Sequence, residues 1–228
     1  MDDNKQFWER FSRHYSGFMR RSQATYQQIC KAMRPFLKRD MDVLELACGT
    51  GQLSVPLSPC VRSWEATDFS AEMIRQAKKQ VHSSRLHFSV QDATKLPYGP
   101  ESFDAVVISN ALHIMPHPEK ALTEAWRVLK PGGLLFAPTF VWGKSRRASL
   151  RLWFMELSGF RVYHVWTAGE LMAYLSERRY SIVRHQLLGS SLAPLCCLMA
   201  RKIPDERTAA WQTTVRSAQL DDPKVKEE

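Results

Sequence analysis

The sequence contains no long apolar run. None of its stretches approaches the ~18 apolar residues that a membrane-spanning helix needs, and its N-terminal segment is too polar for the apolar core of a signal peptide. No repeat with a period of ~20–50 residues is visible, which argues against solenoids and propellers. The 228 residues, 44% of them hydrophobic, therefore predict one domain of generous size.

Cysteines are few, odd in number and poorly spaced for a metal centre. The five are Cys30, Cys48, Cys60, Cys196 and Cys197, and neither a CxxC motif nor a histidine cluster accompanies them. We therefore expect no disulfide framework and no metal site. This cysteine usage favours a reducing, cytoplasmic compartment.

Positive charge is concentrated in the two flanks of the chain. The net charge is +9, from 32 Lys and Arg against 23 Asp and Glu. Residues 1–40 carry +5 and residues 141–202 carry +7, whereas residues 41–140 are close to neutral. Nucleic acid and peripheral contact with an anionic membrane therefore stay open as partners, beside an ordinary solvated surface. No nucleic-acid-binding motif is present, which disfavours nucleic acid.

Between residues 41 and 140, apolar runs alternate with helical patterns. The apolar runs predict five strands, at 43–47, 61–67, 86–90, 103–109 and 134–140. Helices are expected from Ser70 as N-cap to about residue 80, and over 118–130, where the sequence Lys-Pro-Gly-Gly predicts a stop and a turn. This alternation is typical of an α/β fold with a parallel sheet and helices on both faces.

The flanks follow a different pattern. Residues 1–39 predict two helices rich in aromatic residues, and residues 145–160 predict a basic, aromatic-rich helix. Thr167 followed by Glu170 marks the start of a helix that runs to about residue 177. Two strands, 180–188 and 192–202, are expected to close the fold. Residues 203–228 lose periodicity and are expected to form a mobile tail.

The segment most indicative of chemistry is VLELACGTG, residues 43–51. It predicts a buried strand that enters a Gly-x-Gly turn, formed by Gly49 and Gly51, and then a helix. Glycines let the backbone turn sharply and let a ligand approach it closely. The third glycine of a dinucleotide fingerprint would fall at Ser54, so the sequence fails that pattern.

Three acidic residues lie at or near the ends of three successive predicted strands. Glu45 is inside the first strand, Asp68 ends the second and Asp92 follows the third. In an open α/β sheet these positions border one crevice, where an acid can accept ribose hydroxyls or an amino group. The alternative is that each carboxylate is satisfied by nearby backbone N–H groups.

The chain resembles the class I S-adenosylmethionine-dependent methyltransferases, of the small-molecule type that includes the ubiquinone/menaquinone C-methyltransferases. The resemblance rests on VLELACGTG (43–51), ATDFSAEMIRQAK (66–78), VQDATKLPYGPESFDAVVISNALHIMPHPEKAL (90–122) and WRVLKPGG (126–133). It implies a Rossmann-like, doubly wound, seven-stranded sheet whose last strand is antiparallel. It also implies a cofactor-binding methyltransferase domain over 41–202, with a helical lid over 1–40 and a lid insertion over 141–178.

The resemblance implies S-adenosyl-L-methionine as cofactor. Glu45 would lie close to its ammonium group. The backbone at Ala47, Gly49 and Gly51 would pass its methionine part. Asp68 would hold the ribose hydroxyls.

The remaining implied contacts involve the adenine and the sulfonium. Phe69 and Met73 would pack on the adenine. Asp92 would accept from its amino group, with Ala93 beside it. Asn110, Ala111 and His113 would lie where the loop after the fourth strand passes the sulfonium. Tyr15 would be the N-terminal tyrosine that closes over the cofactor.

A general base is needed only if the acceptor is protonated at neutral pH. The catalytic candidates are His113 and His14, against the alternative that both are ordinary surface or hydrogen-bonded histidines. Tyr15 is equally explained by packing alone.

Aromatic and arginine residues in 1–39 and 141–175 favour a small, partly apolar or acidic acceptor. Two alternatives stay open. One is an RNA or protein methyltransferase that uses the basic flanks. The other is a non-catalytic relative that binds the cofactor or a partner. The sequence lacks the Asn/Asp-Pro-Pro-Tyr/Phe motif of nucleobase and glutamine methylation, which disfavours RNA.

Overall fold

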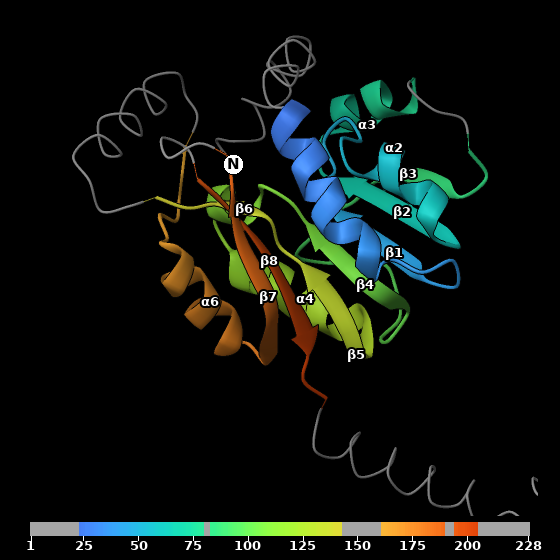
Figure 1. Cartoon of the computed structure of the whole chain (residues 1–228). Helices are drawn as coiled ribbons and strands as arrows, with labels where there is room; N and C mark the ends of the chain where they lie inside the picture. Colours follow the sequence, from blue (N-terminus) through green and yellow to red (C-terminus); the bar gives the residue numbers. More distant parts are fainter. Residues whose placement is uncertain (1–22, 80–82, 143–160, 190–193, 205–228) are drawn as a thin grey trace, which may run out of the picture.

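The computed structural model describes residues 23–79, 83–142, 161–189 and 194–204. Several predictions lie outside these ranges. They are the first N-terminal helix, the helix over 145–160, the tail beyond residue 204, and the candidates His14 and Tyr15. In the described part, helices cover both faces of one central sheet (Figure 1).

The sheet has the strand order β3-β2-β1-β4-β5-β8-β6, and β7 pairs with β8. Its strands are β1 (Asp42–Leu46), β2 (Ser63–Asp68), β3 (Leu86–Val90), β4 (Phe103–Ile108), β5 (Leu129–Phe136), β6 (Thr139–Phe140), β7 (Tyr180–Leu188) and β8 (Leu195–Lys202). Strands β1 to β5 are parallel, and β8 runs antiparallel to β5. The Rossmann-like class and the antiparallel last strand are confirmed. The sheet has eight strands rather than seven because the predicted fifth strand is divided into β5 and the two-residue β6.

Two apolar layers enclose the sheet. On one face, β1 and β4 pack against α4 (Pro118–Val128) and α6 (Ala168–Ser176). On the other face, the same strands pack against the helix over residues 23–33, α2 (Ser54–Leu57) and α3 (Ala71–Lys78). Three short 3-10 helices complete the described helices: η1 (Arg34–Phe36), η2 (Ser58–Cys60) and η3 (Leu112–Ile114). Because β1 and β4 are buried on both faces, they are nearly continuous apolar runs.

Helix starts follow the predicted capping residues. The Ser70 side chain accepts a hydrogen bond from the backbone N–H of Met73 at 3.3 Å, which confirms it as the N-cap of α3. Thr167 and Glu170 form a complete capping box at the start of α6. Each cap satisfies backbone donors that lack partners within the helix.

The segment Lys-Pro-Gly-Gly differs from its prediction. Instead of a free turn, it belongs to β5, which begins at Leu129 directly after α4. The pairing with β4 shifts here from Phe103↔Leu129 to Ala105↔Leu134, so the segment is an irregularity within the strand. A Cβ at Gly133 would lie 2.9 Å from the carbonyl oxygen of Lys130, so this close approach requires glycine.

Candidate cofactor site

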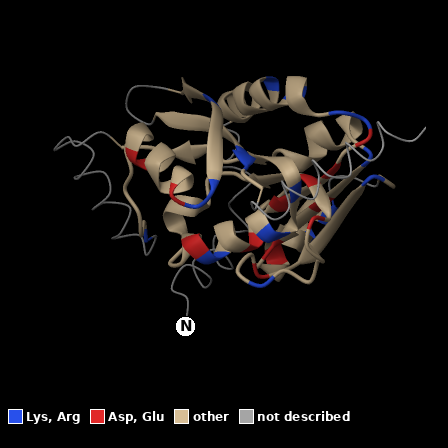
Figure 2. Cartoon of the chain, turned by 90° about the horizontal axis from the view of Figure 1, so that it is seen from below, with Lys and Arg blue, Asp and Glu red and all other residues tan. Residues whose placement is uncertain are grey.

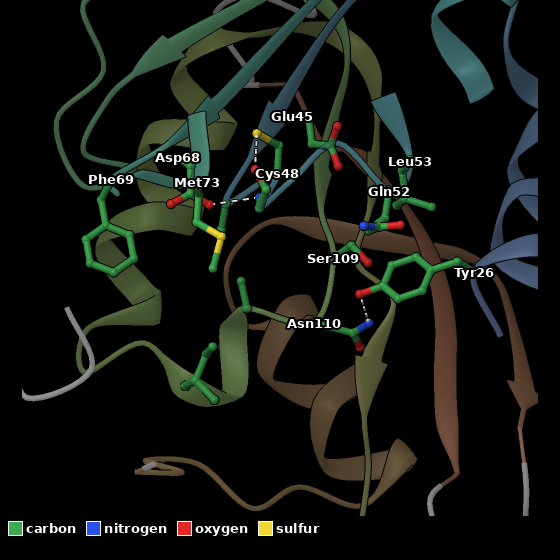
Figure 3. A pocket seen from close by; sticks show the side chains of 14 residues that line it. Tyr26, Glu45, Cys48, Gln52, Leu53, Asp68, Phe69, Met73, Ser109 and Asn110 are labelled. Atoms are coloured by element: carbon green, nitrogen blue, oxygen red, sulfur yellow. Dashed lines mark hydrogen bonds between the residues drawn. The ribbon is translucent and has the colours of Figure 1, made fainter. Parts of the chain in front are cut away.

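A cleft opens at the carboxyl ends of β1, β2 and β4 (Figure 3). The strand order reverses between β1 and β4, and open α/β sheets bind ligands at such a switch point. The lining residues are Tyr26, Glu45, Ala47, Cys48, Gly49, Gln52, Leu53, Asp68, Phe69, Met73, Ser109, Asn110, Ala111 and Ile114.

The turn after β1 forms one wall of the cleft. Its backbone is left-handed at Ala47, with φ 55°, at Gly49, with φ 56°, and at Gly51, with φ 87°. Gly51 does not line the cleft, but a Cβ there would lie 3.1 Å from Val55 and 3.3 Å from Phe88. The glycine therefore lets the turn pack closely on its own helix and on β3.

Glu45 lies on β1 with 2% of its surface exposed, and it borders the cleft. Its Oε2 accepts a hydrogen bond from the indole Nε1 of Trp64 at 3.0 Å. Burial raises the pKa of Glu45 to about 8, although the hydrogen bond from Trp64 acts in the opposite direction. The carboxyl group is therefore largely protonated at neutral pH in the free protein, and a cation in the cleft would favour its ionisation.

Asp68 ends β2 and connects the glycine turn to α3. Its Oδ2 accepts from the backbone N–H of Gly49, and its Oδ1 accepts from that of Ser70, both at 2.9 Å. Burial raises the pKa of Asp68 to about 6, and these two backbone donors limit the rise. Figure 3 shows Asp68, Phe69 and Met73 together at one end of the cleft, so a carboxylate and two apolar side chains border the same space.

The opposite end of the cleft is polar. Asn110, with a left-handed φ of 53°, donates from Nδ2 to the hydroxyl of Tyr26 at 3.3 Å. The Asn110 Oδ1 and the Ser109 Oγ are buried without hydrogen-bond partners among the described residues. Buried polar atoms are rarely left unpaired. Two such atoms on the wall of one cleft therefore indicate a polar ligand.

Besides Gly51, three of the predicted site residues in the described part lie away from this lining. Asp92 is exposed, and its Oδ1 accepts from the backbone N–H and the hydroxyl of Thr94, each at 2.8 Å. Ala93 follows it outside the lining. His113 is 4% exposed and packs against Phe140 and Trp142, with ring centroids 6.1 and 5.2 Å away.

Sequence reasoning missed six lining residues: Tyr26, Cys48, Gln52, Leu53, Ser109 and Ile114. Cys48, Gln52 and Leu53 lie within or next to the quoted glycine segment. Tyr26 could have been found from its spacing with Ile29 and Met33, because positions i, i+3 and i+7 share one helix face. Nothing local to the sequence reports its contact with Asn110, 84 residues away.

The residues present fit S-adenosylmethionine. Glu45 offers a carboxyl group to an ammonium, and Asp68 offers one to vicinal hydroxyls. Phe69 and Met73 supply apolar surface for a flat base. The Ser109 Oγ and the Asn110 Oδ1 are available to polar groups of the ligand. In the described ranges, no group of three or more His, Cys, Asp or Glu is arranged to hold a metal ion.

The fold and the cleft define a Rossmann-like domain that binds a nucleoside-containing cofactor. A family model described as a methyltransferase domain matches residues 44–137. Residues 44–137 therefore form a methyltransferase domain, and S-adenosylmethionine is the cofactor of this domain. The match covers the glycine turn and every lining residue of the cleft except Tyr26.

A demethylmenaquinone methyltransferase of Renibacterium salmoninarum is 42% identical over 98 residues, which are 43% of this chain and 40% of that protein. The chain thus spans less than half the length of the curated relatives it matches. A solved S-adenosylmethionine-dependent methyltransferase of Thermotoga maritima is 22% identical, with a TM-score of 0.70 over 87% of this chain and 99% of that one. The [4+2]-cyclase SpnF, also 22% identical, has a TM-score of 0.66 over 80% and 82%. The fold by itself therefore does not define the reaction.

Proposed function

We propose that the protein transfers a methyl group from S-adenosylmethionine to a small, partly apolar or acidic acceptor. The observation that carries the proposal is that two buried carboxyl groups, Glu45 and Asp68, line the same cleft on either side of the glycine turn. Glu45 would receive the ammonium of the cofactor and Asp68 its ribose hydroxyls. Phe69 and Met73 would pack on its adenine.

The other cofactor contacts are proposed with different support. Asn110 and Ala111 line the cleft, and the unpaired Oδ1 of Asn110 supports a polar contact there. Asp92 and Ala93 lie outside the lining. Their proposed contact with the adenine amino group therefore rests on the family resemblance.

A bound sulfonium supplies a methyl group that is already activated. The residues of the chain then have to bind, orient and exclude water. Burial lowers the pKa of His113 to about 3, so its imidazole is neutral and is a weak general base. Its buried Nδ1 has no partner within the described ranges, which suits a hydrogen bond to the acceptor better than proton removal. A contribution from His14 or Tyr15 rests on sequence alone.

The names of the curated relatives support a ring acceptor of the demethylmenaquinone kind, methylated on carbon. An apolar acceptor of this kind would bring the protein to a membrane surface from the cytoplasm. Among the described residues, no helix is long and apolar enough to cross a bilayer.

The surface gives less support to the RNA alternative. Figure 2 shows basic and acidic residues interspersed over the described part of the chain. Several of the basic side chains form ion pairs with acidic ones, as in Arg62–Asp42 and Lys130–Asp104. Arginines and lysines in such ion pairs are less available to phosphates than a continuous basic stripe would be.

Calorimetric binding of S-adenosylhomocysteine tests the proposal. We expect binding by the unsubstituted chain and a loss of at least tenfold in Asp68→Ala. Asp40→Ala removes an exposed aspartate before β1 and should bind normally. Asp92→Ala then reports whether Asp92 contacts the adenine. Absence of binding by the unsubstituted chain would contradict the proposal, and incubation with radiolabelled donor and candidate quinols tests the acceptor.

A further inference from the structure

Trp64 lies directly behind the acidic end of the cleft. In the parallel pairing of β1 and β2, Val43 lies opposite Trp64 and Glu45 lies opposite Ala66. Alternate residues of a strand share a face, so Trp64 and Glu45 are diagonal neighbours on one face of the sheet. Trp64 is completely buried and is not among the residues that line the cleft. Glu45 therefore separates Trp64 from any ligand.

The indole of Trp64 has one polar atom, and that atom contacts Glu45. An indole N–H can only donate, and a buried one needs an acceptor. The acceptor is the Glu45 Oε2 at 3.0 Å. Since the Trp64 N–H binds Oε2 from the core side, it restricts the orientation of the carboxyl group at the wall of the cleft.

We propose that Trp64 is a positioning residue, which orients the Glu45 carboxyl group toward a primary ammonium in the cleft and favours its ionised form when that cation binds. This inference rests on the proposed function, because the ammonium is that of S-adenosylmethionine. A phenylalanine or leucine would fill the same apolar space without a polar atom that needs a partner. The feature that distinguishes tryptophan from these residues at this position is the N–H that it donates to Glu45.

The surroundings of Glu45 explain why its hydrogen-bond donors matter, the indole N–H of Trp64 first and Ser54 after it. The titratable groups that interact with it are Asp68 at the end of β2, Cys48 in the turn and Cys30 on the helix over residues 23–33. Asp68 repels negative charge on Glu45, and the two buried thiols have raised pKa values and are neutral. Against this repulsion and burial, the Trp64 N–H is the largest influence that lowers the Glu45 pKa.

The test is the substitution Trp64→Phe, which removes the donor and keeps an aromatic ring. Loss of a hydrogen bond to a charged group raises a carboxyl pKa by about one to two units. Affinity for S-adenosylhomocysteine at pH 7 should therefore fall about 10- to 100-fold, since each unit adds about tenfold to the cost of ionising Glu45. The loss should shrink as the pH approaches 9 to 10.

A second ligand separates positioning from folding. Methylthioadenosine carries the adenosine part of the cofactor without the amino acid, so it does not need Glu45. We expect Trp64→Phe to bind it as the unsubstituted chain does. The matched control is Trp126→Phe. It removes an indole whose buried Nε1 has no hydrogen-bond partner in the described part of the chain, and it should leave both affinities unchanged.

The outcomes distinguish this inference from the proposed function. If the unsubstituted chain binds neither ligand, the proposed function fails. If Trp64→Phe weakens both ligands equally, or weakens S-adenosylhomocysteine to the same degree at every pH, Trp64 is only structural and the inference is wrong.

Should Trp64→Phe not fold, nitrogen-15 NMR of the unsubstituted chain provides the test. The Trp64 indole resonance should titrate with Glu45 and respond to S-adenosylhomocysteine but not to methylthioadenosine. The substitution Glu45→Gln should abolish that titration, and an indole resonance that ignores both pH and ligand would overturn the inference.

Discussion

Glu45→Gln should make the ligand-free protein more stable in mildly alkaline solution. The folded protein holds the pKa of Glu45 at about 8, against an ordinary value of 4.5, because the carboxyl group is fully buried. The folded state therefore binds more protons than the unfolded state between these two pH values. The free energy of unfolding must fall as the pH rises through that interval.

The structure also sets the size of the effect. A carboxyl group whose pKa is raised contributes nothing unfavourable below pH 4.5, where it is protonated in both states. Above pH 4.5, the raised pKa lowers the free energy of unfolding by up to about 1.4 kcal/mol per pH unit. The accumulated cost reaches at most about 5 kcal/mol by pH 8. Glutamine keeps a carbonyl oxygen for the Trp64 N–H and removes the ionisation, so it should recover most of this cost.

Urea unfolding between pH 5 and pH 9, at constant ionic strength, measures the prediction. The free energies of unfolding of the two proteins should be similar at pH 5 and should diverge steadily to pH 8. Asp68 contributes in the same direction between pH 3.8 and about 6, but it is common to both proteins and cancels in the difference. Parallel pH profiles, or a Glu45→Gln protein that is less stable at pH 8, would refute the reasoning.

Three further predictions concern the cleft. Calorimetry at pH 7 in buffers of different ionisation enthalpy should show that S-adenosylhomocysteine releases close to one proton, and Glu45→Gln should release none. Gly51→Ala should destabilise the protein by about 1–3 kcal/mol in urea unfolding, because its φ is 87° and its Cβ would lie 3.1 Å from Val55. Tyr26→Phe should weaken S-adenosylhomocysteine several-fold in the same calorimetry by freeing the Asn110 amide, whereas unchanged affinity would show that this hydrogen bond does not shape the site.

Local sequence signals were sufficient wherever one element determines its own structure. Ser70 and Thr167 cap their helices as predicted because a cap depends on a few consecutive residues. The acids Glu45 and Asp68 could be predicted for the site because a carboxyl group in an apolar strand needs a special reason. The chain order of strands and helices then indicates a doubly wound sheet.

Contacts between distant segments could not be predicted in this way. Tyr26 reaches Asn110 through the packing of the first described helix on β1 and β4, which no local pattern encodes. The Lys-Pro-Gly-Gly segment resembles a turn, but the pairs with β4 on either side of it, Phe103↔Leu129 and Ala105↔Leu134, keep it within β5. Trp64 is a similar case, because only the register of β1 and β2 shows that its N–H meets Glu45.

The free-energy cost of ionising the buried Glu45 carboxyl group destabilises the ligand-free protein. The same cost makes the cleft selective for a cationic ligand. A neutral ligand leaves Glu45 protonated and gains nothing from its charge. An ammonium lets the group ionise, and the cost of burial is then offset by a direct ion pair. Linkage requires that the pH dependence of stability and the pH dependence of cofactor affinity follow the same ionisation of Glu45. A variant that removes one dependence must therefore remove the other, and Glu45→Gln is expected to be both the more stable protein and the weaker binder.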